Sequence, residues 1–207
     1  MKGFKEKTLL ILTDYFPNEN GSVPMGVFVK SQVDELKNYF KKIIVISPTP
    51  YAPNVLKNSS LLTPFQKGCI EMKDYSYGNV EVYFPRFYTL PINYFRKRNA
   101  EFAAKSVLKL ISRKKLDFDF VHAHFTWMSG YIANQIKKKL DKEYFLTIHE
   151  NSVWFKEELN SGDERIYSTW KNAKALIRVN KQDIPSLKKY NKEAVYVPEI
   201  VILISMY

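Results

Sequence analysis

Short apolar runs alternate with helix-like segments along most of this chain, and this alternation limits the folds that it can adopt. Residues 8–13 form a continuous run, Thr-Leu-Leu-Ile-Leu-Thr, and such a run is typical of a strand that is buried on both faces. Residues 27–40 then show apolar positions close to a helical period. The pattern predicts further strands at 43–47, 80–84, 118–123, 144–148 and 175–179, and further helices at 94–112, 129–140, 165–172 and 182–190. We therefore predict an α/β fold, a doubly wound parallel sheet with helices on both faces.

Composition excludes several classes of protein. The 207 residues are enough for one large domain or two small ones, and 45% apolar with 26% charged residues excludes a disordered chain. The single cysteine, Cys69, excludes a disulfide framework and suits a reducing compartment. No stretch approaches the roughly 20 apolar residues of a membrane span, and the run at 9–12 is too short for a signal peptide. Residues 48–79, rich in Pro, Asn and Ser, are expected to form a long loop with a short helix. We expect a cytoplasmic protein.

The positive charge is concentrated in one segment. The net charge is +11, which favours anionic partners. Residues 93–115 hold eight basic residues and one acid, Glu101, and so carry +7 of it. In a helical projection with about 3.6 residues per turn, the basic residues share one face with Tyr94, Phe95 and Phe102, while Ala103, Val107, Leu110 and Ile111 lie opposite. The basic residues of that face are Arg98, Lys105, Lys109 and Arg113.

Two interpretations of this basic face stay open. Aromatic rings among cations are typical of a peripheral membrane contact, here with Phe95, Phe102 and the four basic residues as membrane-binding residues. The alternative is a solvated basic helix whose aromatic rings pack under the preceding loop. Nucleic-acid binding lacks a recognised motif, and we expect no nucleic-acid partner.

All three histidines lie at the ends of predicted strands, within residues 122–149. Ligands bind at the carboxyl ends of the strands in open α/β sheets, which makes these imidazoles the first site candidates. His122 and His124 are two residues apart and therefore point to the same face. This spacing suits zinc, but the only third ligand to suggest itself is Glu150, so no metal is expected. We expect His122 to be structural and His124 to lie on the rim of a cleft.

The order of motifs resembles that of a known family. The matching segments are residues 9–17, 26–36, 119–124 with 129–130, 146–149, 173–180 and 195–198. Together they resemble the N-terminal domain of a family-4 glycosyltransferase of the GT-B fold. The resemblance implies that residues 1–198 form a single Rossmann-like, acceptor-side domain. Residues 199–207 are then an atypical apolar tail at the place where the linker to a donor domain would start.

The resemblance also implies roles for individual residues. The histidine matching His149 lines the cleft and contacts the donor sugar, which makes His149 the catalytic candidate; the alternative is a histidine that caps its strand. The loop 18–26, with Gly21 and Gly26, would lie beside acceptor and donor phosphate, although without a Gly-x-Gly fingerprint it also fits a plain connection. The remaining substrate-binding candidates are His124, Glu150 and Asn151.

The chain departs from the family in two places. Glu150 stands where the family commonly has glycine, which puts the shape of the site around His149 in doubt. After Pro198 the family's Asn-Gly is replaced by Glu199-Ile, and the acidic motif of the donor domain has no counterpart. A frameshift, a premature stop or a split gene would each explain this tail. We also considered Glu150, Glu157 and Glu158 as the source of a hydrolase carboxylate pair. Glu157 and Glu158 are adjacent in a predicted helix and therefore diverge, so we expect both to lie on a solvated surface.

These observations predict a retaining glycosyltransferase domain. It would transfer a sugar from a nucleotide-sugar donor to a polysaccharide or lipid-linked acceptor, need no cofactor, and be truncated and inactive alone. The expected partners are the nucleotide sugar, the acceptor, a membrane surface and a separate donor-domain chain. The alternative is a non-catalytic sugar- or membrane-surface binding module, or a subunit that a separate donor domain completes.

Overall fold

A computed structural model describes residues 4–23, 25–60, 62, 64–89 and 96–198. Its centre is an eight-stranded sheet in the order β10-β9-β8-β7-β1-β2-β5-β4. Neighbouring strands are parallel except for the hairpin of β4 and β5. The strands are β1 (Thr8–Thr13), β2 (Lys42–Ile46), β4 (Tyr75–Tyr77), β5 (Val80–Tyr83), β7 (Phe120–His124), β8 (Tyr144–Ile148), β9 (Ala175–Arg178) and β10 (Ala194–Tyr196). A separate parallel pair joins β3 (Thr49–Pro50) to β6 (Arg86–Phe87).

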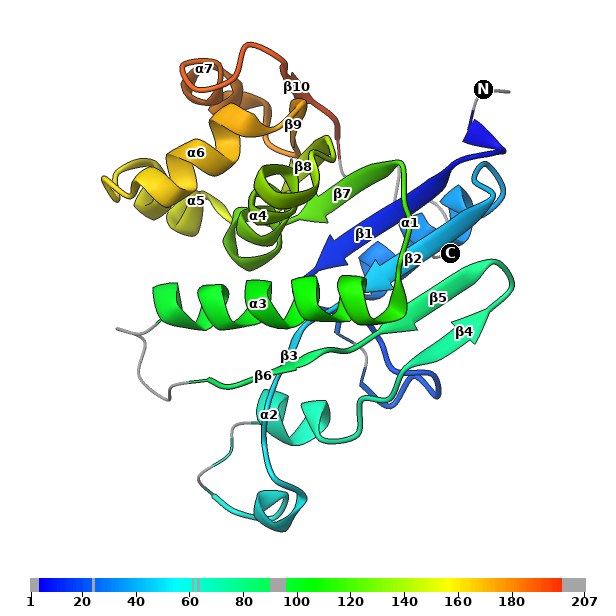
Figure 1. Cartoon of the computed structure of the whole chain (residues 1–207). Helices are drawn as coiled ribbons and strands as arrows, with labels where there is room; N and C mark the ends of the chain where they lie inside the picture. The colour runs from blue at the N-terminus through cyan, green and yellow to red at the C-terminus, as the bar shows by residue number, and fades with distance from the viewer. Residues whose placement is uncertain (1–3, 24, 61, 63, 90–95, 199–207) are drawn as a thin grey trace.

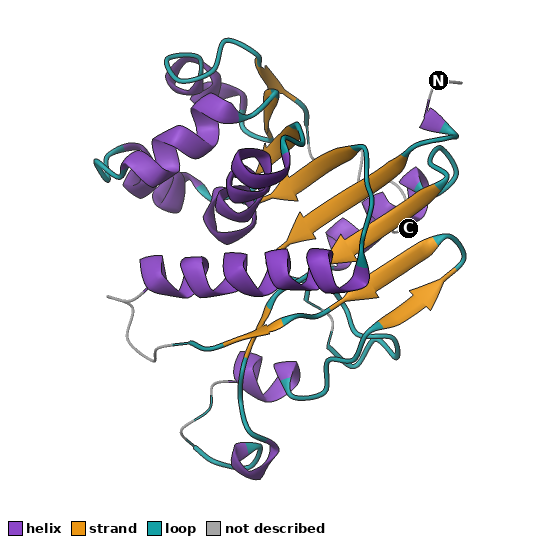
Figure 2. Ribbon diagram, viewed as in Figure 1, coloured by secondary structure: helices purple, strands orange, loops and turns teal. Residues whose placement is uncertain are grey.

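Helices cover both faces of the sheet (Figures 1 and 2). One face carries α3 (Arg96–Lys114), α4 (Tyr131–Leu140) and α6 (Glu164–Asn172), and the other carries α1 (Val27–Leu36). Alternate residues of β1 enter the two cores, Leu10 and Leu12 on the α3 side and Leu9 and Ile11 on the α1 side. Because both faces are buried, the strand is a continuous apolar run. The predicted doubly wound sheet is confirmed.

Several elements differ from the sequence prediction. Residues 48–79 contain β3, the short 3-10 helix Asn54–Leu56, α2 (Pro64–Cys69) and β4. Helix α5 (Ser152–Leu159) follows β8, and the helix expected at 182–190 is the short α7 (Ile184–Leu187) after a 3-10 turn, Lys181–Asp183. Residues 195–198 resemble the entry to a linker, but Val195 and Tyr196 belong to the edge strand β10, which pairs with β9. The proposed tail 199–207 lies outside the described residues.

The strand order of the sheet reverses at β1. From β1 the chain builds outward through β2 and β5 on one side, and through β7, β8, β9 and β10 on the other. The carboxyl ends of β1 and β7 therefore meet at a topological switch point, the place where open α/β sheets bind ligands.

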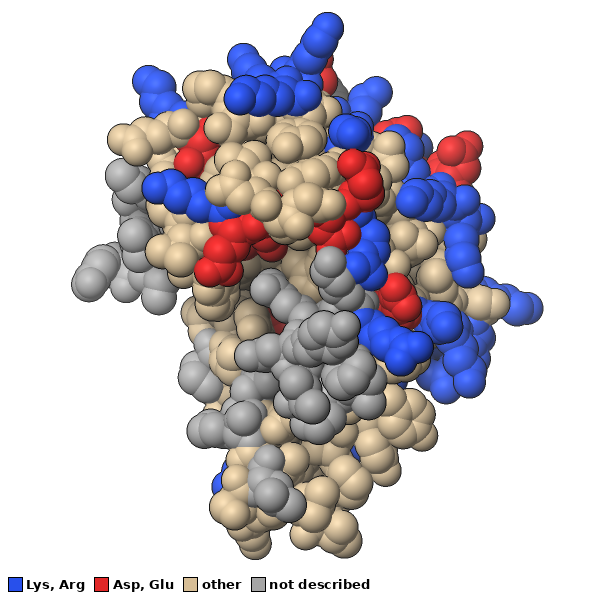
Figure 3. Space-filling model, turned by 90° about the vertical axis from the view of Figure 1, so that its left-hand side faces the viewer, with Lys and Arg blue, Asp and Glu red and all other residues tan. Residues whose placement is uncertain are grey.

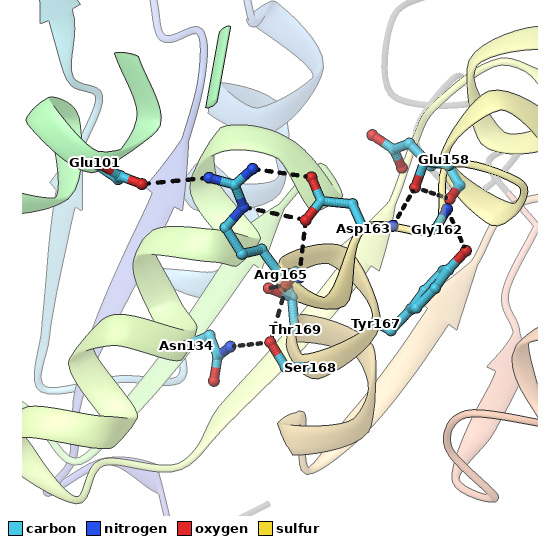
Figure 4. A network of polar contacts seen from close by, with 10 residues as sticks. Glu101, Asn134, Glu158, Gly162, Asp163, Arg165, Tyr167, Ser168 and Thr169 are labelled. Carbon is cyan, nitrogen blue, oxygen red and sulfur yellow. Dashed lines mark hydrogen bonds and ion pairs between the residues drawn. The ribbon is translucent and has the colours of Figure 1, made fainter. Parts of the chain in front are cut away.

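Arg165 links α3 to the first turn of α6 (Figure 4). Its guanidinium pairs with Asp163 at 3.1 Å and with Glu101 of α3 at 3.3 Å. Asp163 also caps α6 by accepting a hydrogen bond from the Arg165 backbone N–H. The contact joins two helices that cover the same face of the sheet.

Within the described residues, no helix is both long enough and apolar enough to cross a membrane.

Candidate functional site

Asp14, the residue after β1, connects the end of β1 to the turn that follows β7. Its carboxylate accepts hydrogen bonds from the backbone N–H groups of Met128 and Ser129 at 3.0 Å and from the Ser129 hydroxyl at 2.5 Å. Both residues belong to the turn Thr126–Gly130, which connects β7 to α4. A negative charge therefore already occupies the N-terminal end of this helical segment, where exposed N–H groups favour anions.

The loop between β1 and α1 depends on Gly26. Its φ is +80°, and a Cβ added there would lie 2.1 Å from the carbonyl oxygen of Tyr15. No side chain fits that position, so only glycine lets the chain turn so tightly into α1. Gly21 also has a positive φ, +69°, but open space surrounds it. The Asn18 side chain holds this part of the loop, donating to the Ser22 hydroxyl and accepting from the Val23 N–H.

Helix α1 begins beside the histidines. The ring of Phe28, in its first turn, lies 4.9 Å from the His149 ring and 6.0 Å from the Phe125 ring, measured between centroids. The helix follows Gly26, which has no side chain to cap it. The N-terminal end of α1 and the His149 imidazole are thus neighbours at the switch point.

The structure brings all three histidines together. His124 Nδ1 lies 3.0 Å from His149 Nε2, and His122 Nε2 lies 2.8 Å from the Thr147 hydroxyl. The His122 and His124 rings are 4.3 Å apart, as their shared strand face requires. His124 is fully buried, so the expectation that it lies on the rim of a cleft is wrong. Its strand runs into the centre of the sheet, and β1 and β8 cover it on both sides.

Burial keeps these imidazoles neutral. Desolvation lowers the pKa of His122 and of His149 to about 4 and holds the pKa of His124 well below its usual value. One of His124 and His149 must then donate an N–H to a nitrogen of the other. At neutral pH His149 serves the site as a neutral hydrogen-bonding group, not as a cation.

Glu150 is buried next to this pair. Its Oε1 accepts a hydrogen bond from the Thr126 backbone N–H at 2.5 Å, and Oε2 has no hydrogen-bond partner among the described residues. Burial raises the pKa of this carboxyl, and the nearby charge of Asp14 raises it further. A proton on Glu150 is therefore favoured more than on an exposed glutamate.

Arg178 holds the chain segment that follows β8. Its guanidinium, 1% exposed, donates to the carbonyl oxygens of Ile148 and Glu150 at 2.9 and 2.7 Å and pairs with Asp183 at 2.7 Å. The chain on both sides of His149 is thereby held by one buried cation. Asn151, a substrate-binding candidate in the sequence, uses its side-chain oxygen to cap α5 through the N–H groups of Val153 and Trp154.

A cavity of about 730 Å³ opens beside Asp14 and Glu150. Aromatic, apolar and polar side chains line it together. The described lining residues are Asp14, Tyr15, Pro48, Pro50, Gln66, Phe87, Thr89, Asn99, Phe125, Trp127, Met128, Glu150 and Trp154. Its volume lies within the range of small-molecule sites, about 300–1,000 Å³.

Sequence reasoning missed Asp14, Trp127 and Trp154. Asp14 carried a usable signal, because it directly follows a buried strand. The contact between Asp14 and Ser129 spans 115 positions in the sequence, and no local pattern reports it. Glu158 was expected on the surface but is only 5% exposed, because α5 turns that side toward the protein.

The described residues hold no group of three His, Cys, Asp or Glu side chains arranged to bind a metal ion. His122 and His124 face Thr147 and His149 instead, and Glu150 faces Thr126.

The basic face of α3 is present, but its aromatic part differs from the projection. Arg98, Lys105, Lys109 and Arg113 are exposed. Phe102 is half-buried and packs against the core, so the prediction that it accompanies the cations is wrong; Ala103 and Val107 beside it draw this side of the helix onto the sheet. Phe95 and Tyr94 lie outside the described residues.

Comparison with known proteins gives one curated relative and many structural ones. No family model matches the chain. TuaC of Bacillus subtilis (strain 168), named as a teichuronic acid biosynthesis glycosyltransferase, is 28% identical over 128 residues, which are 62% of this chain and 32% of that protein. The chain thus spans about a third of the curated relative that it matches.

Solved structures share the fold. Arabidopsis thaliana UGT89C1 complexed with UDP has a TM-score of 0.55 at 10% identity, covering 93% of this chain and 52% of that one. Its complex with UDP-L-rhamnose scores 0.54 at 12% identity, covering 94% and 52%. UDP-N-acetylglucosamine 2-epimerase from Rickettsia bellii scores 0.56 at 8% identity, covering 97% and 47%. The chain matches about half of each structure.

Proposed function

Because this chain is a GT-B glycosyltransferase-like domain with a Rossmann-like sheet, we propose that it forms the acceptor-side half of a glycosyltransferase. The enzyme moves a sugar from a nucleotide-sugar donor to a polysaccharide or lipid-linked acceptor. One observation carries the proposal. The start of α1, the His124–His149 pair and the 730 Å³ cavity adjoin one another at the carboxyl ends of β1, β7 and β8.

The donor sugar and its phosphates occupy the His149 side of this site in our proposal. The N-terminal end of α1, entered through Gly26, favours phosphate through its N–H groups and dipole. The neutral His149 imidazole, next to Phe28, hydrogen-bonds a sugar hydroxyl. The nucleotide is held by a second domain, in the same protein or in a separate chain. Structural relatives complexed with UDP and UDP-L-rhamnose support a nucleotide-sugar partner.

Transfer with retention follows from the resemblance to family-4 enzymes. In such a step the bond between the sugar and the departing diphosphate breaks while the acceptor oxygen attacks from the same face. The acceptor proton passes to the leaving phosphate, so neither a metal ion nor an enzyme carboxylate is required. Asp14 fits this scheme because its carboxylate is occupied in holding the turn after β7, from which it accepts three hydrogen bonds.

Donor binding is the first test. Saturation-transfer NMR of the purified protein with UDP-glucose, UDP-N-acetylglucosamine, UDP-glucuronic acid and GDP-mannose should show contacts to the sugar protons of at least one donor. His149→Ala should weaken these signals several-fold, and Lys138→Ala, an exposed change on α4, should not. Equal signals in the two variants would remove His149 from the donor site.

Transfer itself is tested with both domains present. Radiolabelled sugar should reach a polysaccharide or lipid-linked acceptor, with the anomeric configuration preserved by NMR, and His149→Ala should lower kcat about 100-fold, or roughly 2.7 kcal/mol. This domain alone should bind without transferring. An inverted product would exclude the retaining mechanism.

A second candidate function is a non-catalytic sugar-binding module. The cavity supports it, because its aromatic rings and uncharged polar groups are of the kind that bind a sugar. Oligosaccharide binding without transfer, even when a donor domain is supplied, would select this alternative.

We also propose that the exposed cations of α3 hold the protein at the inner face of the cytoplasmic membrane. Co-sedimentation with vesicles containing phosphatidylglycerol should exceed that with pure phosphatidylcholine and should fall with salt. Lys105→Glu with Lys109→Glu should abolish it, and Lys138→Glu with Lys139→Glu on α4 is the matched control. Salt-dependent binding to DNA that exceeds vesicle binding would favour a nucleic-acid partner instead.

A further inference from the structure

We infer that the cavity beside Asp14 and Glu150 is a subsite for an uncharged sugar unit of the acceptor, and that it rejects acidic sugars and phosphates. The inference rests on the proposed glycosyltransferase function and adds the substrate class. The charge of the lining, two polar atoms without partners and the aromatic walls support it.

The charge of the cavity opposes that of the protein. The chain carries +11, yet the charged residues among the described lining are Asp14 and Glu150, and none of the described lining residues is lysine or arginine. Figure 3 looks onto this side of the molecule, toward which the strands of Figure 1 point. Acidic side chains gather across the middle of the visible face, and lysines and arginines lie mostly along its upper and right-hand edges.

An anionic ligand would meet these carboxyl groups at short range. Asp14 and Glu150 are close enough for the charge of Asp14 to raise the Glu150 pKa. A ligand carboxylate or phosphate in the same cavity would feel the same repulsion, and partial burial keeps water and salt from screening it. Two cations near the lining are already paired. Arg178 pairs with Asp183 and donates to backbone oxygens, and Arg165, whose guanidinium lies 5.9 Å from the centre of the Trp127 ring, pairs with Asp163 and Glu101. An uncharged ligand carries no such penalty.

Two buried polar atoms at the cavity match a hydroxyl group. Glu150 Oε2 and the indole N–H of Trp127 have no hydrogen-bond partner among the described residues. A buried polar group without a partner costs free energy. Both atoms are buried, so a hydroxyl reaches them once the neighbouring side chains shift. A sugar hydroxyl both donates and accepts and then satisfies the indole donor and the carboxyl oxygen, whether or not Glu150 is protonated.

Aromatic rings provide the remaining contact surface. The cavity is lined by four aromatic residues, Tyr15, Phe125, Trp127 and Trp154. Trp154 is 55% exposed. Flat rings bury the C–H face of a sugar at little cost in conformational entropy, while the polar groups between them bind its hydroxyls. Aromatic rings together with uncharged polar groups, such as Gln66 and Asn99, suit a sugar better than a lipid chain.

The test compares oligosaccharides that differ only in charge. Tetrasaccharides of glucose, galactose and mannose are titrated into the protein beside the matching uronic-acid oligomers, in which each hydroxymethyl group is a carboxylate. At least one neutral oligomer should bind ten-fold or more tightly than its acidic counterpart at low salt. Equal or tighter binding of the acidic oligomers overturns the inference, as does the failure of all neutral oligomers to bind.

Two variants separate charge from shape. Asp14→Asn keeps the size of the side chain and should tighten binding of the acidic oligomer several-fold. The affinities of the acidic and the neutral oligomer would then be closer to each other. Trp127→Phe keeps an aromatic ring but removes the indole N–H, and should weaken binding of the neutral oligomer three- to ten-fold. Glu157→Gln, an exposed change on α5, is the control and should alter neither. Unchanged selectivity in Asp14→Asn overturns the role of charge, provided that thermal unfolding confirms the fold.

Donor binding is measured on the same samples. If nucleotide sugars bind and neutral oligosaccharides do not, the subsite fails while the proposed function stands. If no nucleotide sugar binds and no transfer occurs with both domains present, the proposed function itself fails.

Discussion

The Nδ1 atom of His124 lies 3.0 Å from the Nε2 atom of His149. The first residue ends β7 and the second follows β8, so the two neighbouring strands deliver their imidazoles to one point. Burial keeps both rings neutral, and a hydrogen bond between them requires a proton on one of the two facing nitrogens and none on the other.

The neutral histidines should make stability depend on pH. The unfolded chain binds a proton on His149 near pH 6.5, whereas the folded chain does so only near pH 4. The stabilisation is therefore complete above pH 6.5 and is lost as the pH falls toward 4, by about 1.4 kcal/mol per pH unit. Urea unfolding of wild type and His149→Gln between pH 7.5 and 4.5 measures the difference, in which groups outside the histidine cluster cancel. Parallel pH curves would contradict the buried, neutral state.

Gly26→Ala should destabilise the protein more than Gly21→Ala. Both glycines have positive φ, which costs a non-glycine residue about 1–2 kcal/mol. Only at Gly26 does the new Cβ also collide with the Tyr15 carbonyl, at 2.1 Å. We expect a loss of about 1 kcal/mol for Gly21→Ala and more than 2 kcal/mol for Gly26→Ala in denaturant unfolding. Equal losses would show that the loop relaxes around the new methyl group.

Arg178→Met should be severely destabilising. It would leave the carbonyls of Ile148 and Glu150 without their donor and Asp183 without its partner. Removing one member of a buried ion pair costs about 3–5 kcal/mol. The same replacement at exposed Arg113 should cost under about 0.5 kcal/mol. A small loss at Arg178, measured by urea unfolding, would mean that water replaces the guanidinium.

Asp163 should stabilise α6 by capping as well as by its charge. Asp163→Ala removes the acceptor for the Arg165 backbone N–H and the ion pair with its side chain, and we expect a loss of about 1–2 kcal/mol. Asp163→Asn keeps a cap but not the charge, and should recover at least half of that loss. If both variants lose equally in thermal unfolding, the ion pair alone matters.

Buried, repetitive parts of the fold were predictable from the sequence. The expected bounds of the strands at 8–13 and 144–148 agree with the structure, because strands covered on both faces are continuous apolar runs. The common strand face of His122 and His124 follows from the two-residue period of a strand, and the structure confirms it.

Parts that depend on long-range contacts were not predictable. Strand β10 is short and lies at the sheet edge, where Val195 and Tyr196 are 46% and 42% exposed, so it lacks a buried pattern. The burial of Glu158 and the half-buried position of Phe102 depend on neighbouring elements that a helical projection does not contain. At the site, the sequence predicts that His124 and His149 lie at the carboxyl ends of neighbouring strands. It does not predict the cavity or the position of its carboxyl groups, because these depend on how the turn after β7 folds in three dimensions.

The carboxylate of Asp14 has a consequence for how a ligand can enter. Two helical segments direct their N-terminal ends to the switch point, and Asp14 closes the one at Ser129 while the one after Gly26 has no side-chain cap. The site is therefore polarised, with one anion-accepting end and one anion-repelling end. A bound molecule with a phosphate at one end and hydroxyls at the other has a single favourable direction. If the proposed function holds, this polarity would orient the two substrates head to tail before any sugar-specific contact is made.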